Sequence, residues 1–119
     1  MDPGLARTGY GVIELHSGSG ARLVEAGLIR TSRTETLPRR LARVAQGLKA
    51  LIGQHKPDIV AVEDLYSYYK TPKPAILMGH VRGVVLGPAA LTDIPVFSYL
   101  PTRIKQAVVG QGHATKSQV

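Results

Sequence analysis

The stretch that most constrains the fold is a short apolar run, residues 59–62, that stops at two carboxylates, Glu63 and Asp64. A run of small and β-branched residues of this length is too short for a helix and is typical of a strand buried on both faces. Alternation along the strand puts Val60 and Val62 on one face and Glu63 on the other. Ligands in open α/β sheets bind beyond the carboxyl ends of the strands, so this strand end is a candidate site. Taken alone, the segment favours a simpler interpretation, in which the acids only mark the return of the chain to water.

The composition limits the partners and the kinds of metal site. Fifteen Lys and Arg against eight Asp and Glu give a formal charge of +7, which favours polyanionic partners. A chain of 119 residues makes one domain with a real core. It has no cysteine, and its four histidines show no ligand spacing, so any metal site must be built from carboxylates.

No membrane segment is expected. The longest uninterrupted apolar stretch, residues 83–91, is too short to cross a bilayer, and the N-terminus has no charged segment followed by an apolar one. We therefore expect a cytoplasmic protein without a membrane partner.

Periodicity and turn residues predict the order of elements. Thr36 can cap a helix whose first turn holds Pro38. The Pro-Gly turn at residues 3–4 should follow a strand, which we expect before Asp2. In order, the expected elements are antiparallel strands at 10–15 and 23–29 joined by a hairpin loop at 17–20, a helix at 37–52, a strand at 59–63, a helix at 75–86, a strand at 95–99, and helices that begin near 101 and 114.

This order describes an α/β fold in which helices flank a mixed sheet. On the first helix, the basic side chains and His55 are expected on the solvated polar face, opposite the apolar stripe. On the second helix, Gly79, Gly83 and Gly87 recur at four-residue spacing, which predicts close packing of the helix backbone.

The expected loop at residues 64–74 is a candidate nucleic-acid contact. It holds three of the five tyrosines of the chain, including Tyr66, together with Lys70 and Lys73. Aromatic rings can stack on bases while neighbouring cations hold phosphates. The alternative is that single tyrosines only cover the edge of the core.

Asp2 and Glu63 form the most informative pair. A phosphate-binding P-loop is excluded, because Tyr10 and Gly11 stand where the Lys and Ser or Thr of that motif belong. Two acids at the ends of separate strands, on a basic chain, indicate carboxylate-held Mg²⁺ acting on phosphate esters. Such a site usually needs three or four carboxylates. Asp2 and Glu63 provide two, and alternation sends Asp64 to the other face, where it is expected at the surface.

The chain resembles the bacterial RuvC-type Holliday junction resolvases over essentially its whole length. Each short motif of this resemblance could occur in unrelated proteins, whereas the order and spacing of all the motifs together are specific for this family. The pieces are the Asp2-Pro3-Gly4 turn and residues 8–13 (TGYGVI), 27–31 (GLIRT), 37–41 (LPRRL), 60–63 (VAVE), 79–84 (GHVRGV), 95–99 (PVFSY), 104–110 (IKQAVVG) and 116–119 (KSQV).

The resemblance implies an RNase H-like fold of the retroviral integrase superfamily, with residues 1–119 as a single domain. It also implies a homodimer that makes paired symmetric nicks in four-way junction DNA. The nicking would serve homologous recombination, DNA repair and the SOS response, in cooperation with the RuvA–RuvB branch-migration complex. The implied cofactor is Mg²⁺, for which Mn²⁺ can substitute, with two ions per active site.

The resemblance also implies roles for individual residues. Asp2 and Glu63 match metal-binding catalytic acids. Tyr66 stands where the family has an aromatic residue, usually Phe, that engages bases near the junction centre. The basic residues Lys105 and Lys116 match catalytic positions near the scissile phosphate. Residues expected to bind DNA are Tyr66, Lys70, Lys73, Arg103, Lys105 and Lys116.

The chain departs from the family pattern at both ends. Only Met1 remains of the apolar strand that precedes the Asp-Pro-Gly turn, and the last two catalytic acids lie on a C-terminal helix beyond residue 119. We therefore expect a domain that lacks its first strand and its C-terminal helix, has half of its metal ligands, and is a poor nuclease or none.

Three alternatives stay open at this point. The first is another RNase H-like nuclease with a different nucleic-acid substrate. The second is a non-catalytic junction-binding module of the same fold. The third is an actin-like ATPase with a similar Asp-Gly turn, for which the sequence offers no adenosine motif.

Overall fold

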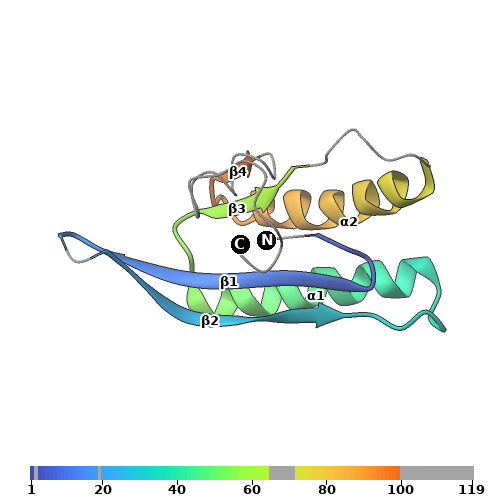
Figure 1. Cartoon of the computed structure of the whole chain (residues 1–119), viewed down its shortest axis with the longest axis horizontal. Coiled ribbons are helices and arrows are strands. Elements are labelled where there is room, and N and C mark those ends of the chain that lie inside the picture. The colour runs from blue at the N-terminus through green and yellow to red at the C-terminus, as the bar shows by residue number, and fades with distance from the viewer. Residues whose placement is uncertain (2, 19, 65–71, 100–119) are drawn as a thin grey trace, which may run out of the picture.

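The computed structural model describes residues 1, 3–18, 20–64 and 72–99 (Figure 1). The elements are β1 (Arg7–His16), β2 (Gly20–Arg30), α1 (Leu37–His55), β3 (Val60–Glu63), α2 (Pro72–Leu91) and β4 (Val96–Tyr99). The predicted order of strands and helices up to residue 99 is confirmed. The helices predicted near 101 and 114 lie outside the described residues.

β1 and β2 form an antiparallel hairpin, as predicted, with Tyr10 opposite Gly27. The register shifts once, and Val24 is the extra residue of a β-bulge. At the turn, Gly18 and Gly20 have φ angles of 80° and 83°, which glycine adopts without a steric penalty.

Helix α1 covers one face of this hairpin. Gly47 permits the close approach, because a Cβ at this position would lie 2.8 Å from the Ile29 side chain. The opposite face leaves several apolar side chains of the hairpin exposed, namely Ile13, Leu15, Leu23 and Leu28.

Helix α1 begins where the sequence predicted. The backbone of Thr36 is extended at the N-cap, although its side chain makes no capping hydrogen bond. The helix ends at Lys56, which adopts a left-handed conformation with φ of 46°. The apolar stripe buries Val44 and Leu48.

Helix α2 is longer than predicted at both ends. It begins at Pro72 rather than Ala75, because proline is well suited to a first helical turn, where its missing N–H has no helical partner. It also continues through Pro88, since Val85 and Ala89 on this last part of the helix are fully buried.

The predicted close packing at Gly79, Gly83 and Gly87 is wrong. In the part of the chain that the structure describes, no heavy atom beyond the neighbouring backbone lies within 4 Å of a Cβ placed at any of these positions. The buried stripe of α2 runs through Val81 and Val85, and each glycine stands two residues away, about 200° around the helix. The glycines therefore lie on the side away from the core.

By length and composition alone, α2 is long and apolar enough to cross a membrane. Three of its residues, Val81, Val85 and Ala89, are nevertheless fully buried in the protein core. Its Arg82 is hydrogen-bonded to both β3 and β4. One face of α2 thus packs in the core, although only 17% of its apolar window is buried in this structure.

A single core joins the two helices and β3. Figure 1 shows α1 and α2 running in the same direction, and the two helices pack on each other. The buried apolar residues of this core are Val44, Leu48, Val60, Val62, Val81, Val85 and Ala89. Val60 and Val62 thus define the side of β3 that faces the helices.

The described strands combine antiparallel and parallel pairing, as expected, in two two-stranded sheets. β3 and β4 pair in parallel, with Val62 opposite Ser98. The other edge of β3 is occupied by Met1, whose carbonyl accepts the Glu63 amide at 2.8 Å and whose amine donates to the Ala61 carbonyl. Met1 thus bonds the Ala61 carbonyl and the Glu63 amide, the backbone groups on the edge of β3 opposite β4. Figure 1 shows the N-terminus between the hairpin and β3.

Glu25 of β2 joins Tyr10 of β1 to His55 at the end of α1. The Tyr10 hydroxyl donates to Glu25 Oε2 at 2.8 Å, and His55 Nε2 lies 3.5 Å from Glu25 Oε1. The side chain of His55 is 13% exposed, so its predicted place on the solvated face is wrong. The reason is that the last turn of α1 lies against β2.

The Tyr10 hydrogen bond predicts a pH dependence of stability. Donation to the Glu25 carboxylate raises the pKa of the Tyr10 phenol. A group whose pKa is higher in the folded state contributes stability below its unfolded pKa, about 10 for Tyr, and loses it as the pH rises through the folded value. We expect the advantage of the wild type over Tyr10→Phe in urea unfolding to shrink above about pH 10. A constant difference between pH 7 and pH 11 would contradict this coupling.

Candidate functional site

Glu63 is the last residue of β3, and its side chain lies on the face of the strand turned away from the helices. Val60 is 8% exposed and Val62 is 1% exposed on the helix-facing side, while Glu63 is partly exposed. The alternation predicted from the sequence is therefore confirmed. Burial of the two valines holds β3 in place. Because side chains alternate along a strand, the Glu63 carboxylate then points away from the helices.

Three hydrogen bonds hold the main chain at this strand end. The Glu63 amide donates to the Met1 carbonyl at 2.8 Å, and the Asp64 amide donates to the Tyr99 carbonyl at 2.7 Å. The Glu63 carbonyl accepts a hydrogen bond from Arg82 Nε at 3.1 Å. The end of β3 is thus bonded to the N-terminal segment, to β4 and to α2.

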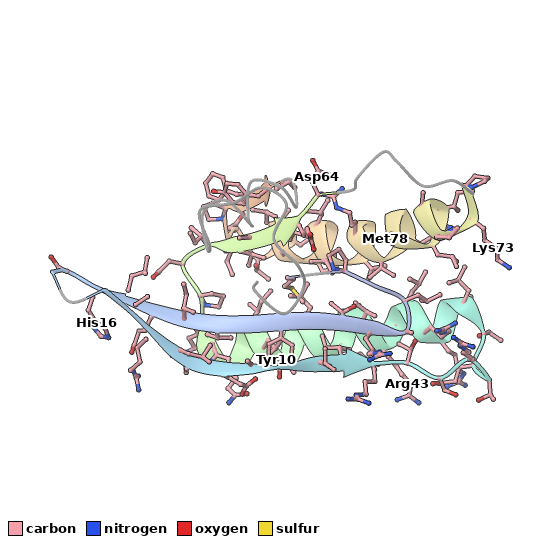
Figure 2. The ribbon with its side chains drawn as sticks, viewed as in Figure 1. Tyr10, His16, Arg43, Asp64, Lys73 and Met78 are labelled. Carbon is pink, nitrogen blue, oxygen red and sulfur yellow. The ribbon has the colours of Figure 1, made fainter. Side chains whose placement is uncertain are left out.

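Asp64 lies on the helix-facing side, as alternation predicts, but it is not simply a surface acid. Its side chain, labelled in Figure 2, is 41% exposed, and its Oδ1 lies 3.3 Å from Arg82 Nη2. The same Nη2 donates to the Ser98 hydroxyl at 2.9 Å. Asp64 therefore belongs to a contact between α2 and the β3–β4 sheet.

Arg82 is the residue of this site that the sequence analysis missed. It is the one Arg, Lys, Asp or Glu residue of α2 beyond the first turn, and it directly follows the fully buried Val81. A cation next to a buried position in such a helix must find oxygen partners, which was the available signal. Its partners lie 16 to 19 residues away in the chain, so local periodicity does not identify them.

The turn that begins at Pro3 is built around a buried hydroxyl. Thr8 is completely buried, and its Oγ1 donates to the Gly4 carbonyl at 2.9 Å. A Cβ on residue 4 would lie 2.6 Å from the Arg7 carbonyl oxygen, so glycine is required there. This turn, together with the bond between Met1 and Glu63, holds the described residues on both sides of position 2.

The turn is also tied to α1. Thr31 Oγ1 donates to the Leu5 carbonyl and accepts a hydrogen bond from Arg40 Nε at 2.9 Å. The Thr31 amide donates to the Ala6 carbonyl at 3.1 Å. Arg40 thus has a structural role and does not belong to the purely solvated face that its helical position suggested.

Two surface arginines elsewhere, Arg22 and Arg43, are paired with acids. Arg22 lies 2.6 Å from Glu14, and its hydrogen bond lowers the pKa of that carboxyl. Arg43 lies 2.7 Å from Glu35; this hydrogen bond lowers the pKa of Glu35 and raises the pKa of Arg43. Both arginines are more than half exposed to water, so the contribution of these pairs to stability is small.

Of the residues expected to bind DNA, the structure describes Lys73. It is exposed in the first turn of α2, and Figure 2 shows it at the far end of that helix from Asp64. Lys73 is therefore remote from the end of β3. The other predicted site residues, Asp2, Tyr66, Lys70, Arg103, Lys105 and Lys116, lie outside the described residues.

Within the described ranges, no three His, Asp or Glu side chains lie together in a way that could hold a metal ion. Glu63 offers hard carboxylate oxygens of the type that Mg²⁺ and Mn²⁺ prefer. Asp64 leaves the strand on the opposite face and is paired with Arg82. Of the two carboxylates predicted to hold a metal ion, Asp2 and Glu63, the structure thus describes one, Glu63.

Comparison with known proteins shows the family. The model of the family described as crossover junction endodeoxyribonuclease RuvC matches residues 1–119, the whole chain. The chain belongs to the RuvC family. The resemblance seen in the sequence is confirmed, and RuvC proteins are metal-dependent nucleases.

Similar curated RuvC proteins come from several bacteria. The protein from Rhodopirellula baltica is 47% identical over 121 residues, which cover all of this chain and 66% of that protein. The protein from Petrotoga mobilis is 44% identical over 119 residues, which cover all of this chain and 72% of that protein. The chain thus spans about two thirds of the length of the first of these relatives.

The solved structures that are similar to the chain include two of RuvC from Thermus thermophilus. The structure of T. thermophilus RuvC in complex with a Holliday junction substrate has a TM-score of 0.88 at 33% identity, covering 99% of this chain and 71% of that one. A second Thermus thermophilus RuvC structure has a TM-score of 0.84 at 33% identity, covering 98% and 71%. The RNase H-like α/β fold predicted from the sequence is confirmed.

Proposed function

We propose that the protein carrying this chain is a structure-specific DNA endonuclease that resolves Holliday junctions by paired symmetric nicks. The observation that carries the proposal is the fixed end of β3. There Glu63 is bonded through its amide to Met1, the residue that directly precedes Asp2 in the sequence. Membership of the RuvC family and the junction bound by the similar T. thermophilus protein support the choice of substrate.

In this proposal Asp2 and Glu63 hold a divalent ion, Mg²⁺ with Mn²⁺ as a substitute, and two ions serve each active site. Such ions supply an activated water and stabilise the leaving oxygen of a phosphodiester. Glu63 would orient its ligand oxygens through the rigid strand, and Lys105 and Lys116 would hold the scissile phosphate. Lys70, Lys73 and Arg103 would bind flanking phosphates, which position the DNA without reading its sequence.

The proposal extends to partners and location. Paired symmetric nicks require two active sites related by symmetry, which favours a homodimer. We also propose cooperation with the RuvA–RuvB branch-migration complex, roles in recombination, DNA repair and the SOS response, and a cytoplasmic location. Membership of the RuvC family supports these assignments. The formal charge of +7 supports binding to DNA.

A non-catalytic junction-binding module is the second candidate function. The formal charge of +7 supports this candidate as well, because it favours binding to DNA whether or not the DNA is cleaved. This candidate predicts tight binding of four-way junctions without any nicking.

A cleavage panel tests the proposal. The protein at its natural length would be incubated with Mg²⁺ and a four-way junction, a linear duplex or an RNA/DNA hybrid of matched length. We expect paired nicks in the junction and little cleavage of the other two. Preferred cleavage of the hybrid or the duplex would favour another RNase H-like nuclease, and binding without cleavage would favour the non-catalytic module.

Tyr66→Ala is expected to lower junction cleavage more than it lowers junction binding. Base stacking contributes about 1–3 kcal/mol per base, whereas phosphate contacts supply most of the affinity. Single-turnover cleavage rates and gel-shift titrations of the same preparations would measure both effects. Tyr66→Phe, which keeps the ring, is the matched control and should cleave at the wild-type rate. Equal losses in cleavage and binding for Tyr66→Ala would argue against a role at the junction centre.

A further inference from the structure

Arg82 connects the helix layer to the strand end that carries Glu63. Its side chain is 14% exposed, and Nε donates to the Glu63 carbonyl at 3.1 Å. Its Nη2 donates to the Ser98 hydroxyl at 2.9 Å and lies 3.3 Å from Asp64 Oδ1. One planar guanidinium thus contacts two residues of the β3 end and one residue of β4.

The geometry separates these contacts from the carboxylate of Glu63. Ser98 is the register partner of the buried Val62, so its side chain faces the helices, as does that of Asp64. The Glu63 side chain leaves the strand on the opposite face. Arg82 therefore holds Glu63 through its main-chain carbonyl, from beneath the sheet.

The stretch of α2 that carries Arg82 is packed in the core. The preceding residue, Val81, and Val85 one turn later are both fully buried in the core between α1, α2 and β3. Through its hydrogen bond to the Glu63 carbonyl, the guanidinium therefore holds the last residue of β3 in a fixed position relative to the packed helix α2. Ligand side chains at functional sites must be held within about 0.5 Å of the productive geometry by such supporting contacts.

We infer that Arg82 is a positioning residue that orients Glu63 for divalent-metal binding by fixing its main chain. The inference rests on the function proposed above. Partners that orient metal ligands in this way change metal affinity by about 10- to 100-fold when they are removed. Without the hydrogen bond from Arg82, the Glu63 main chain would lose one of the contacts that fix the direction of its side chain.

The direction in which metal affinity changes when Arg82 is replaced distinguishes a positioning role from a purely electrostatic one. A positive charge near a metal site repels the ion, so the loss of a purely electrostatic Arg82 would tighten metal binding. The loss of a positioning Arg82 weakens it instead. Arg82→Lys keeps the charge but not the planar fork that reaches several oxygens, so it is also expected to weaken metal binding.

The test is a titration with Mn²⁺ of the protein at its natural length, with free Mn²⁺ measured by electron paramagnetic resonance. For Arg82→Gln we expect the dissociation constant for Mn²⁺ to rise by about tenfold. Affinity for a four-way junction in the absence of metal should stay within about twofold, because that affinity comes mainly from phosphate contacts elsewhere. Arg43→Gln, which removes an exposed pair with Glu35, is the matched control and should bind Mn²⁺ as the wild type does.

Hydrogen exchange provides a second measurement. The Glu63 and Asp64 amides are hydrogen-bonded at this strand end, and both should exchange faster in Arg82→Gln, while the amides of α1 keep their protection. Faster exchange throughout the chain would indicate a global loss of stability and would overturn a local positioning role.

Several results would overturn the inference while leaving the proposed function intact. These are wild-type Mn²⁺ affinity in a folded Arg82→Gln, tighter binding in that variant, or wild-type affinity in Arg82→Lys. If Arg82→Gln does not fold, the result for Arg82→Lys decides. A wild-type protein that binds no Mn²⁺ and nicks no junction would instead contradict the proposed function itself.

Discussion

Replacing Glu63 with Gln is expected to abolish nicking of four-way junctions and to leave junction binding nearly unchanged. The amide keeps the shape of the side chain and removes the charge that holds the metal ion. Metal ions contribute several kcal/mol of transition-state stabilisation, and each ~1.4 kcal/mol is a factor of ten in rate. The expected loss in the single-turnover rate is therefore on the order of a thousandfold.

Asp64→Asn is the matched control for Glu63→Gln. It makes the same change of acid to amide on the next residue, whose side chain lies on the helix-facing side of the strand. Its amide oxygen can still accept a hydrogen bond from Arg82, so nicking should stay within a few-fold of the wild type. A Glu63→Gln protein that nicks at the wild-type rate would show that the site is elsewhere.

The largest expected effect on stability comes from Val85→Asp. Val85 is fully buried in the apolar core between α1 and α2, so a carboxylate there would be cut off from water. An uncompensated buried charge costs about 3–5 kcal/mol, a large part of the ~5–15 kcal/mol that stabilises a typical domain. We expect a folded fraction that is greatly reduced in thermal or urea unfolding, or a chain that does not fold.

Ile76→Asp is the control on the same helix. Ile76 is 59% exposed, so the same carboxylate stays in water and the free energy of unfolding should change by about 0.5 kcal/mol or less. This pair of variants also tests the placement of α2 as a core helix. If Ile76→Asp were as damaging as Val85→Asp, the apolar outer face of α2 would be buried in a larger assembly or a membrane.

The fold around the site could be predicted where the controlling pattern is local. The run of β-branched residues before Glu63 specified a strand, and alternation correctly separated Val62 from Glu63. The start of α2 could not be predicted in this way, because proline is common both in loops and in the first turn of a helix, and α2 begins at Pro72. The glycine spacing of α2 identified a helix face, but it did not indicate which side of the helix meets the core.

The candidate site was only partly predictable for the same reason. The acids stand at strand ends, and a strand end can be recognised from a few consecutive residues. Arg82 acts through partners 16 to 19 residues away, and that proximity depends on how α2 packs against β3 and β4. The pairing of Met1 with Glu63 joins still more distant parts of the chain, and only the folded structure shows it.

The most direct test of the central claim, that Asp2 and Glu63 hold the same divalent ion, is a double-mutant cycle of Mn²⁺ affinity. The four proteins are the wild type, Asp2→Asn, Glu63→Gln and the double variant, titrated at their natural length without DNA. Two ligands of one ion act as a unit, so each single variant should lose most of the affinity and the double variant should lose little more. Losses that simply add, or wild-type affinity in either single variant, would contradict a shared site.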